Sequence, residues 1–164
     1  MTAFDDLLAA NETFAAGFSS SGLTGTAARG LAVVTCMDSR IDPLGLLGLQ
    51  PGDAKILRNA GARVTDDVLR TLVLAVYLLG VNRVLVMPHT DCGMTKVSDD
   101  DVHDLTSAKG VDTRSIDFHT IPNQDEALRH DLIKVRTSPF LPQDMPVGGA
   151  LYDVRTGKLL PVDL

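Results

Sequence analysis

Two short apolar segments, each followed closely by metal-binding residue types, constrain this chain most. Residues 31–35 and 83–87 are rich in valine and leucine and are bounded by turn-forming residues, as expected for strands buried on both faces of a parallel sheet. Cys36 follows the first segment, and His89 and Cys92 follow the second. Because ligands bind beyond the carboxyl ends of parallel strands, we expect these three side chains to share one crevice.

Two cysteines and one histidine form a ligand set typical of zinc. Two thiolates and an imidazole leave a fourth tetrahedral position open for water, and this arrangement favours catalysis over a purely structural site. The alternative is that both cysteines are small core hydrophobes, since free cysteine is among the most buried residue types. A His-x-x-Cys pattern alone is a weak signal. The neighbouring residues therefore decide between the two interpretations.

The composition fits a globular protein and argues against several kinds of partner. The chain has 164 residues, of which 45% are hydrophobic and 22% charged, so we expect one domain over 1–164. A net charge of −6 and the absence of tryptophan argue against a nucleic-acid partner. The N-terminus does not resemble a signal peptide, and the apolar segment 68–79 is too short to span a bilayer. We therefore expect a cytoplasmic protein with no membrane partner.

The pattern of the remaining segments predicts an α/β fold. Strands that alternate with helices indicate βαβ units and a parallel sheet. Residues 148–162 alternate apolar and polar side chains on each side of a Thr-Gly turn, which predicts a hairpin. Helix 4–18 has little nearby chain to cover its apolar side chains, so we expect it to pack on a partner subunit. The other predictions are a strand at 54–57, helices at 43–49, 66–79 and 124–136, and a loop or helix start at 98–104.

An aspartate and an arginine follow the first predicted metal ligand, in the sequence Cys-Met-Asp-Ser-Arg. Arg40 can pair bidentately with Asp38, which keeps the carboxylate ionised and fixes its orientation. Beside zinc, this carboxylate can align a metal-bound hydroxide or swing onto the metal as a fourth ligand. Elsewhere such a pair is a surface ion pair worth about 0–1 kcal/mol. Its position directly after Cys36 favours a catalytic role.

Three motifs, in one order along the chain, resemble the β-class carbonic anhydrases: C-M-D-S-R, R-N-A-G and H-T-D-C-G. The resemblance implies a mainly parallel central sheet with flanking helices and an antiparallel C-terminal edge strand. It implies one zinc ion per chain, held by Cys36, His89 and Cys92, with Asp38 and Arg40 as the catalytic dyad. It also implies a homodimer or a higher even oligomer.

The reaction implied by this resemblance is the reversible hydration of carbon dioxide to bicarbonate and a proton. Plant-type members place a glutamine ahead of the first cysteine, at the position where Ala27 stands here. Another group must then orient the substrate. The expected substitutes are the backbone N–H of Gly93 and the segment from Asn59 to Gly61, since glycine lets the backbone approach a ligand closely.

Two other functions stay open from the sequence. Relatives of these enzymes with the same zinc ligands hydrolyse carbonyl sulfide or carbon disulfide, and motifs do not separate these substrates from carbon dioxide. The other alternative is a catalytically silent zinc protein that senses bicarbonate or serves as a scaffold, and the intact Asp38 and Arg40 argue against it. The remaining histidines lie in polar stretches and are interpreted as ordinary exposed residues: His103, His119 and His130.

Overall fold

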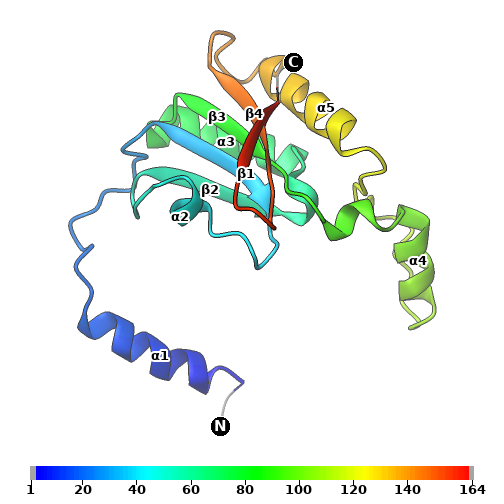
Figure 1. Ribbon diagram of the computed structural model, residues 1–164, viewed down its shortest axis with the longest axis horizontal. Helices are drawn as coiled ribbons and strands as arrows, with labels where there is room; N and C mark the ends of the chain where they lie inside the picture. Colours follow the sequence, from blue (N-terminus) through cyan, green and yellow to red (C-terminus); the bar gives the residue numbers. More distant parts are fainter. Residues whose placement is uncertain (1–2, 163–164) are drawn as a thin grey trace.

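The computed structural model describes residues 3–162, which fold around a five-stranded sheet (Figure 1). The strands lie in the order β2-β1-β3-β4-β5. The first four are parallel, and β5 runs antiparallel to β4. The predicted mainly parallel sheet with an antiparallel C-terminal edge strand is therefore confirmed. The strands are β1 (Leu31–Cys36), β2 (Ala54–Asn59), β3 (Arg83–Met87), β4 (Val147–Tyr152) and β5 (Leu159–Val162).

Strand β1 has a neighbour on each side and is the most completely buried of the five. All its residues except Leu31 are buried, which explains why this segment is apolar on both faces. In the parallel register, Cys36 lies opposite Asn59 of β2, and Thr35 lies opposite Met87 of β3. The carboxyl ends of β1, β2 and β3 are therefore level, and the loops that follow them meet at one edge of the sheet.

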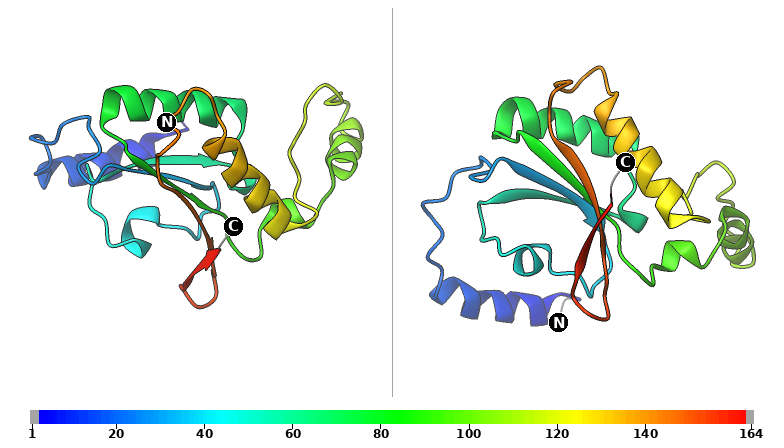
Figure 2. Two further views of the ribbon diagram at one scale, coloured as in Figure 1. Left: turned by 90° about the horizontal axis from the view of Figure 1, so that it is seen from above. Right: turned by 45° about the horizontal axis from the view of Figure 1, so that its top comes forward.

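The two longest helices cover one face of the sheet (Figures 1 and 2). Helices α3 (Asp66–Leu79) and α5 (Gln124–Arg136) bury apolar residues in one cluster with the strands. The opposite face carries a smaller cluster and the short helix α2 (Pro43–Leu46). Cys36 and Cys92 belong to this smaller cluster, so the functional edge lies on the less covered side. The buried apolar residues of the two long helices are Val68, Leu72, Ala75, Leu128, Leu132 and Val135.

Local signals explain where the helices begin and end. The Thr65 hydroxyl accepts a hydrogen bond from the Val68 amide at the start of α3, and Gly80 ends that helix with φ +75°. Helix α4 (Asp99–Ser107) begins with a capping box between Ser98 and Asp101. The segment 98–104 is therefore a helix start, one of its two predicted states. The short helix predicted to reach residue 49 ends earlier, because Gly48 adopts φ +63°.

The C-terminal hairpin forms as predicted. Strands β4 and β5 pair as far as Tyr152 and Leu159. Between them, the Asp153 amide donates to the Lys158 carbonyl at 2.8 Å, and Gly157 adopts φ +71°. The Thr-Gly turn places a glycine where the backbone needs a left-handed conformation.

Helix α1 (Asp5–Ala16) stands apart from the sheet (Figure 1). None of its twelve residues, all of which the structure describes, is buried. Large apolar side chains of α1 and its flanks are 53–64% exposed: Phe4, Leu7, Leu8, Phe14 and Phe18. The predicted helix is present, and its apolar side chains have no cover from the rest of the described chain. No helix in the described part of the chain is long and apolar enough to cross a membrane.

Candidate active site

The ends of β1 and β3 bring three metal-binding side chains together. Cys36 is the last residue of β1, and His89 and Cys92 lie in the loop after β3. The two Sγ atoms are 4.0 Å apart, and these sulfurs and a His89 ring nitrogen all lie within 4.8 Å of one another. All three residues are buried. The convergence expected from the strand ends is therefore present.

The histidine is held in one tautomer. His89 Nδ1 lies 2.9 Å from the Thr90 carbonyl oxygen, and because a carbonyl can only accept, Nδ1 carries the hydrogen. In the neutral ring that a metal ion requires, Nε2 is then a bare acceptor. It is fully buried and has no hydrogen-bond partner among the described residues, which is costly unless another group binds it. Two sulfurs about 2.3 Å from a tetrahedral zinc lie about 3.8 Å apart, close to the spacing seen here. The residues therefore fit a metal ion.

The two thiols differ in their acidity without a metal. The hydrogen bond between the two sulfurs, over the opposing effect of burial, lowers the pKa of Cys36 to about 3. The Gly61 amide also donates to this sulfur, at 3.4 Å. The hydrogen bond between the two sulfurs raises the pKa of Cys92, and burial raises it further. Burial disfavours protonated His89, but the Cys36 sulfur offsets this, and the pKa of His89 is raised. A thiolate is thus ready at Cys36, as metal binding requires.

Asp38 lies beside this group and is held by Arg40. Arg40 Nε and its backbone amide both donate to Asp38 Oδ1 at 2.9 Å, and Nη2 donates to Oδ2 at 2.8 Å. The Arg40 side chain holds the pKa of Asp38 well below its usual range, and the pKa of Arg40 is raised in turn. Asp38 Oδ2 is 3.8 Å from His89 Nε2. An ionised, oriented carboxylate therefore faces the metal-binding group.

A second aspartate, which sequence reasoning gave no role, also contacts Arg40. Asp91 Oδ2 accepts from Arg40 Nη1 at 2.9 Å, and the Asp91 carbonyl accepts from Nη2 at 3.1 Å. Lys96 bonds the other carboxylate oxygen. Lys96 first, and Arg40 second, lower the pKa of Asp91 to about 2. Asp91 lies inside the H-T-D-C-G motif, but its partner is 51 residues away, so sequence spacing gave no signal for the contact.

Arg58 of the R-N-A-G motif fixes the backbone between the first cysteine and the aspartate. Its Nε donates to the Cys36 carbonyl at 2.8 Å, and its Nη2 donates to the Asp38 carbonyl at 2.7 Å. Both contacts are to the main chain that carries the two functional side chains. The position of Arg58 in a motif pointed to it, but its partners are visible only in the fold.

The predicted substrate-contacting residues have different surroundings. The Asn59 side chain donates from Nδ2 to the Arg63 carbonyl at 2.7 Å and accepts at Oδ1 from the Arg63 amide at 2.9 Å. This side chain therefore closes the loop from 59 to 63. Gly61 adopts φ +83°, and an added Cβ would lie 2.7 Å from Ile121 Cδ1. Gly93 is exposed, with open space where a Cβ would stand. Of the three, Gly93 leaves the most room for a ligand.

A profile of the carbonic anhydrase family matches residues 31–159. Beta-carbonic anhydrase 1 of Mycobacterium tuberculosis is 36% identical to the chain over 159 residues, 97% of each protein. The chain belongs to the β-class carbonic anhydrases. A carbonic anhydrase of Streptococcus mutans of known crystal structure is 38% identical, with a TM-score of 0.94 over 99% of both chains. A carbon disulfide hydrolase of Acidianus is 32% identical over 155 residues, 80% of this chain and 76% of that protein.

Membership of this family gives the reaction. The chain is a carbonate dehydratase, and it catalyses the reversible hydration of carbon dioxide to bicarbonate. The resemblance seen in the three sequence motifs is therefore confirmed. The fold agrees, since the solved carbonic anhydrase of Streptococcus mutans superposes over almost the whole chain.

The three further histidines of this carbonic anhydrase are not all ordinary exposed residues. His119 and His130 are exposed, as predicted. His103 is half-buried, which corrects the prediction: its Nδ1 lies 3.0 Å from the Thr113 hydroxyl, and its ring lies 5.3 Å from that of Phe118. The polar sequence around His103 hid this, because α4 turns the residue toward the loop that follows the helix.

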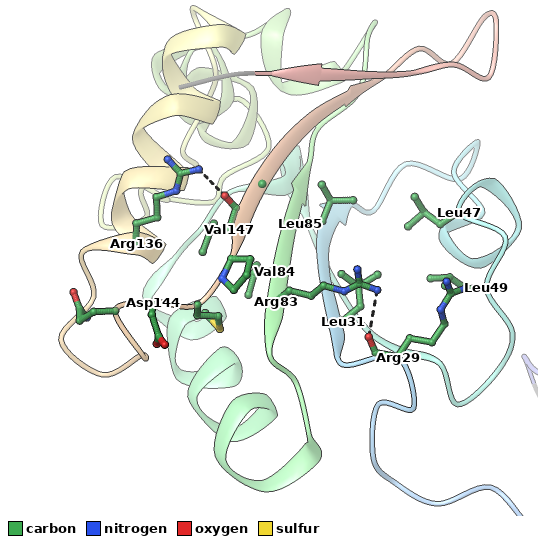
Figure 3. A pocket seen from close by; sticks show the side chains of 14 residues that line it. Arg29, Leu31, Leu47, Leu49, Arg83, Val84, Leu85, Arg136, Asp144 and Val147 are labelled. Carbon is green, nitrogen blue, oxygen red and sulfur yellow. Dashed lines mark hydrogen bonds between the residues drawn. The ribbon is translucent and has the colours of Figure 1, made fainter.

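The carbonic anhydrase also has a groove of about 720 Å³ at the other end of the strands (Figure 3). Its lining includes Leu31 and Arg83, the first residues of β1 and β3, whereas Cys36 ends β1. The groove therefore lies away from the metal-binding group. Its lining combines apolar side chains with three arginines, Arg29, Arg83 and Arg136.

Proposed function

We propose that this β-carbonic anhydrase hydrates carbon dioxide with one zinc ion per chain, held by Cys36, His89 and Cys92. The observation that carries the proposal is the bare, fully buried Nε2 of His89 beside two cysteine sulfurs. Zinc held there would act as a Lewis acid that lowers the pKa of water and so supplies a nucleophile near neutral pH. Two soft thiolates and an imidazole suit zinc better than magnesium or calcium, which prefer oxygen ligands.

Asp38 and Arg40 are proposed to orient the water that attacks carbon dioxide. Asp38 stays ionised because Arg40 bonds both of its oxygens, so it can accept a hydrogen bond from that water and fix the direction of attack. The same two bonds favour a carboxylate held by Arg40 over one that ligates the metal. The 3.8 Å between Asp38 Oδ2 and His89 Nε2 supports this role, because the carboxylate lies next to the metal group.

The substrate contacts are proposed to come from backbone, with Asn59, Gly61 and Gly93 shaping them. Gly93 follows Cys92 directly and is exposed, so its N–H is the proposed donor to a substrate oxygen. Gly61 donates to the Cys36 sulfur, and Asn59 closes the adjoining loop. Their proposed contribution is to hold the wall of the site close to the reacting atoms.

Metal analysis of matched variants tests the zinc proposal. The purified protein should contain one zinc per chain, and Cys92→Ser and His89→Gln should each lose most of it. His130→Gln is the control, because this exposed histidine lies outside the proposed ligand set, and it should keep full zinc and full carbon dioxide hydration. Full zinc occupancy in Cys92→Ser or His89→Gln would show that the ion binds elsewhere.

Hydrolysis of carbon disulfide or carbonyl sulfide is the second candidate function. The observation that favours it is the 32% identity to the carbon disulfide hydrolase of Acidianus. The two reactions need the same kind of metal site, so assays in parallel must separate them. We expect carbon dioxide to be the faster substrate. A higher kcat/KM for carbonyl sulfide than for carbon dioxide would reverse the assignment.

We further propose a homodimer, or a higher even oligomer, in which α1 packs on a partner subunit. The exposed apolar residues of α1 support this, since such surface is rarely left uncovered in a stable protein. Charge supports it too: α1 carries Asp5, Asp6 and Glu12 and no basic residue, whereas three arginines and one aspartate, Asp144, line the groove (Figure 3). A second copy of α1 is the proposed occupant of this groove.

The chain is proposed to act as one catalytic domain over residues 1–164, in the cytoplasm. Residues of the site come from β1, β2 and the loop after β3 in one sheet, which supports a single unit. Both cysteines are free thiols, as a reducing compartment favours. Limited proteolysis checks the first proposal, because a second domain would release a stable fragment that lacks the metal site. Fractionation of cells that produce the protein checks the second.

A further inference from the structure

Arg40 is held on two sides by two different aspartates. Its Nε and Nη2 donate to the Asp38 carboxylate, while Nη1 donates to Asp91 Oδ2 at 2.9 Å and Nη2 also donates to the Asp91 carbonyl at 3.1 Å. Asp91 stands between His89 and Cys92, so the loop that carries these two proposed ligands also holds the arginine. The metal loop and the Asp38–Arg40 pair are thus tied together through one side chain.

The backbone of Asp91 is unusual for a residue with a side chain. Asp91 adopts φ +57°, a left-handed conformation that is uncommon for residues other than glycine and is best tolerated by asparagine and aspartate. Glycine would adopt this turn without steric strain. The chain instead places here a carboxylate with both oxygens engaged, one by Arg40 and one by Lys96. Strained backbone of this kind clusters at functional sites.

A second pair in the same chain shows what Asp91 adds. Asp112 and Arg114 repeat the geometry of Asp38 and Arg40: the Arg114 amide and Nε donate to Asp112 Oδ1 at 3.1 and 2.9 Å, and Nη2 donates to Oδ2 at 2.7 Å. Within the described residues, Arg114 has no other acidic partner. Its side chain is 81% exposed, against 44% for Arg40. A lone exposed pair of this kind holds its geometry weakly; the pair at the active site has a second carboxylate to fix it.

We propose that Asp91 is a positioning residue that fixes the guanidinium of Arg40, and that Arg40 can hold Asp38 in its working orientation only while Asp91 is in place. This rests on the proposed role of Asp38 and Arg40. Asp91 acts through Arg40 and does not touch the reacting atoms. Removing its carboxylate frees one edge of the guanidinium, so Arg40 gains rotamer freedom and Asp38 loses its fixed direction.

Asp91→Gly separates this role from a structural one. Glycine accepts the left-handed backbone, so if Asp91 only shaped the turn, the variant would be as stable and as active as the wild type. We expect normal zinc content and no loss in Tm, but a kcat/KM for carbon dioxide roughly ten-fold lower, the scale of losses around metal sites. Asn keeps an acceptor oxygen and tolerates the left-handed backbone. The kcat/KM of Asp91→Asn should therefore lie between the values of the wild type and Asp91→Gly.

A readout independent of activity is the mobility of Arg40. In ¹⁵N relaxation measurements on the zinc-loaded protein, the Arg40 Nε–H should be ordered in the wild type and mobile in Asp91→Gly. Asp112→Gly is the control for replacing an aspartate that binds an arginine elsewhere on the surface: it removes the partner of Arg114 and should change neither the Arg40 signal nor kcat/KM.

The possible outcomes separate this inference from the function on which it rests. Unchanged kcat/KM in Arg40→Ala would overturn the proposed role of the Asp38–Arg40 pair itself. A low kcat/KM in Arg40→Ala together with wild-type kcat/KM and an ordered Arg40 in Asp91→Gly would overturn only the role of Asp91. Loss of zinc in Asp91→Gly would also overturn it, because Asp91 would then shape the metal loop and not the arginine.

Discussion

Arg40 bonds both carboxylate oxygens of Asp38, at 2.9 and 2.8 Å, and thereby holds an ionised group 3.8 Å from the bare nitrogen of His89. Three contacts from one arginine leave the carboxylate one orientation. This relationship links a common surface interaction to the metal-binding group, and the first prediction follows from it.

Arg40→Ala should keep its zinc and lose most of its activity. Without the guanidinium, the Asp38 carboxylate is free to turn or to bind the metal, so we expect kcat/KM for carbon dioxide to fall roughly 10–100-fold. Arg114→Ala is the matched control, because it breaks the twin pair on the surface and should leave kcat/KM unchanged. Stopped-flow hydration with metal analysis of both variants checks this, and wild-type turnover in Arg40→Ala would remove the pair from the mechanism.

Gly61→Ala should destabilise the protein by about 1–3 kcal/mol, the usual scale of strained backbone. An added Cβ would lie 2.7 Å from Ile121, and the backbone has φ +83°. Relieving this clash would move the Gly61 backbone, including the amide that donates to the Cys36 sulfur. Denaturant unfolding measures the loss, with Gly93→Ala as the stability control, since open space surrounds that position. Equal stability of both variants would contradict the packing described around Gly61.

Low pH should lower the free energy of unfolding of the protein, partly through protonation of Asp99. The Thr120 hydroxyl and, over the opposing effect of burial, the amides of Phe118 and Thr120 lower the pKa of Asp99 to about 2. This pKa lies below that of the unfolded chain, about 3.9, so the stabilisation is complete above about pH 5 and is lost progressively as the pH falls through 3.9 and then through 2. Between these values the Tm of Asp99→Asn should fall less than that of the wild type.

The exposed neighbour Asp100 supplies the control for that comparison. The Tm of Asp100→Asn should fall with pH as that of the wild type does, because the substitution leaves the contacts of Asp99 intact. Parallel curves for the wild type and Asp99→Asn would show that the bonds from Phe118 and Thr120 do not hold the carboxylate.

Charged substitutions on α1 should break the proposed oligomer. Leu7→Glu with Leu8→Glu adds charge to apolar side chains that are 61% and 62% exposed, so we expect dissociation at micromolar concentration or misfolding. Asn11→Glu, on the same helix, should change neither property. Analytical ultracentrifugation decides: a wild-type protein that sediments as an active monomer at every concentration would contradict a role for α1 in assembly.

Much of the fold could be predicted because the central strands β1 and β3 are almost entirely apolar. A continuous apolar run that ends in Cys36 leaves few structures other than a buried strand, and the capping residues mark the helix ends. Contacts between distant residues could not be predicted from spacing. The bond from Arg40 to Asp91 depends on how two loops meet, and the half-buried state of His103 depends on a loop that follows α4.

The surroundings of α1 show a different limit of the sequence. Its apolar residues predicted a helix that needs a cover, and the described chain does not supply one. In the proposed oligomer, the groove of a second copy, lined by Arg29, Arg83 and Arg136, buries these apolar side chains. The cover then comes from the assembly, which is why the ultracentrifuge experiment tests it.

Removal and return of zinc tests whether an ion held by Cys36, His89 and Cys92 is needed to hydrate carbon dioxide. The protein is stripped with a chelator under reducing conditions, and stopped-flow hydration of carbon dioxide is measured while zinc is added back. Activity should disappear with the metal and return in proportion to added zinc, to a plateau at one equivalent per chain, and Cys92→Ser should stay inactive throughout. Full hydration by the zinc-free wild type, or full restoration of Cys92→Ser at one equivalent, would contradict the proposed role of this ion.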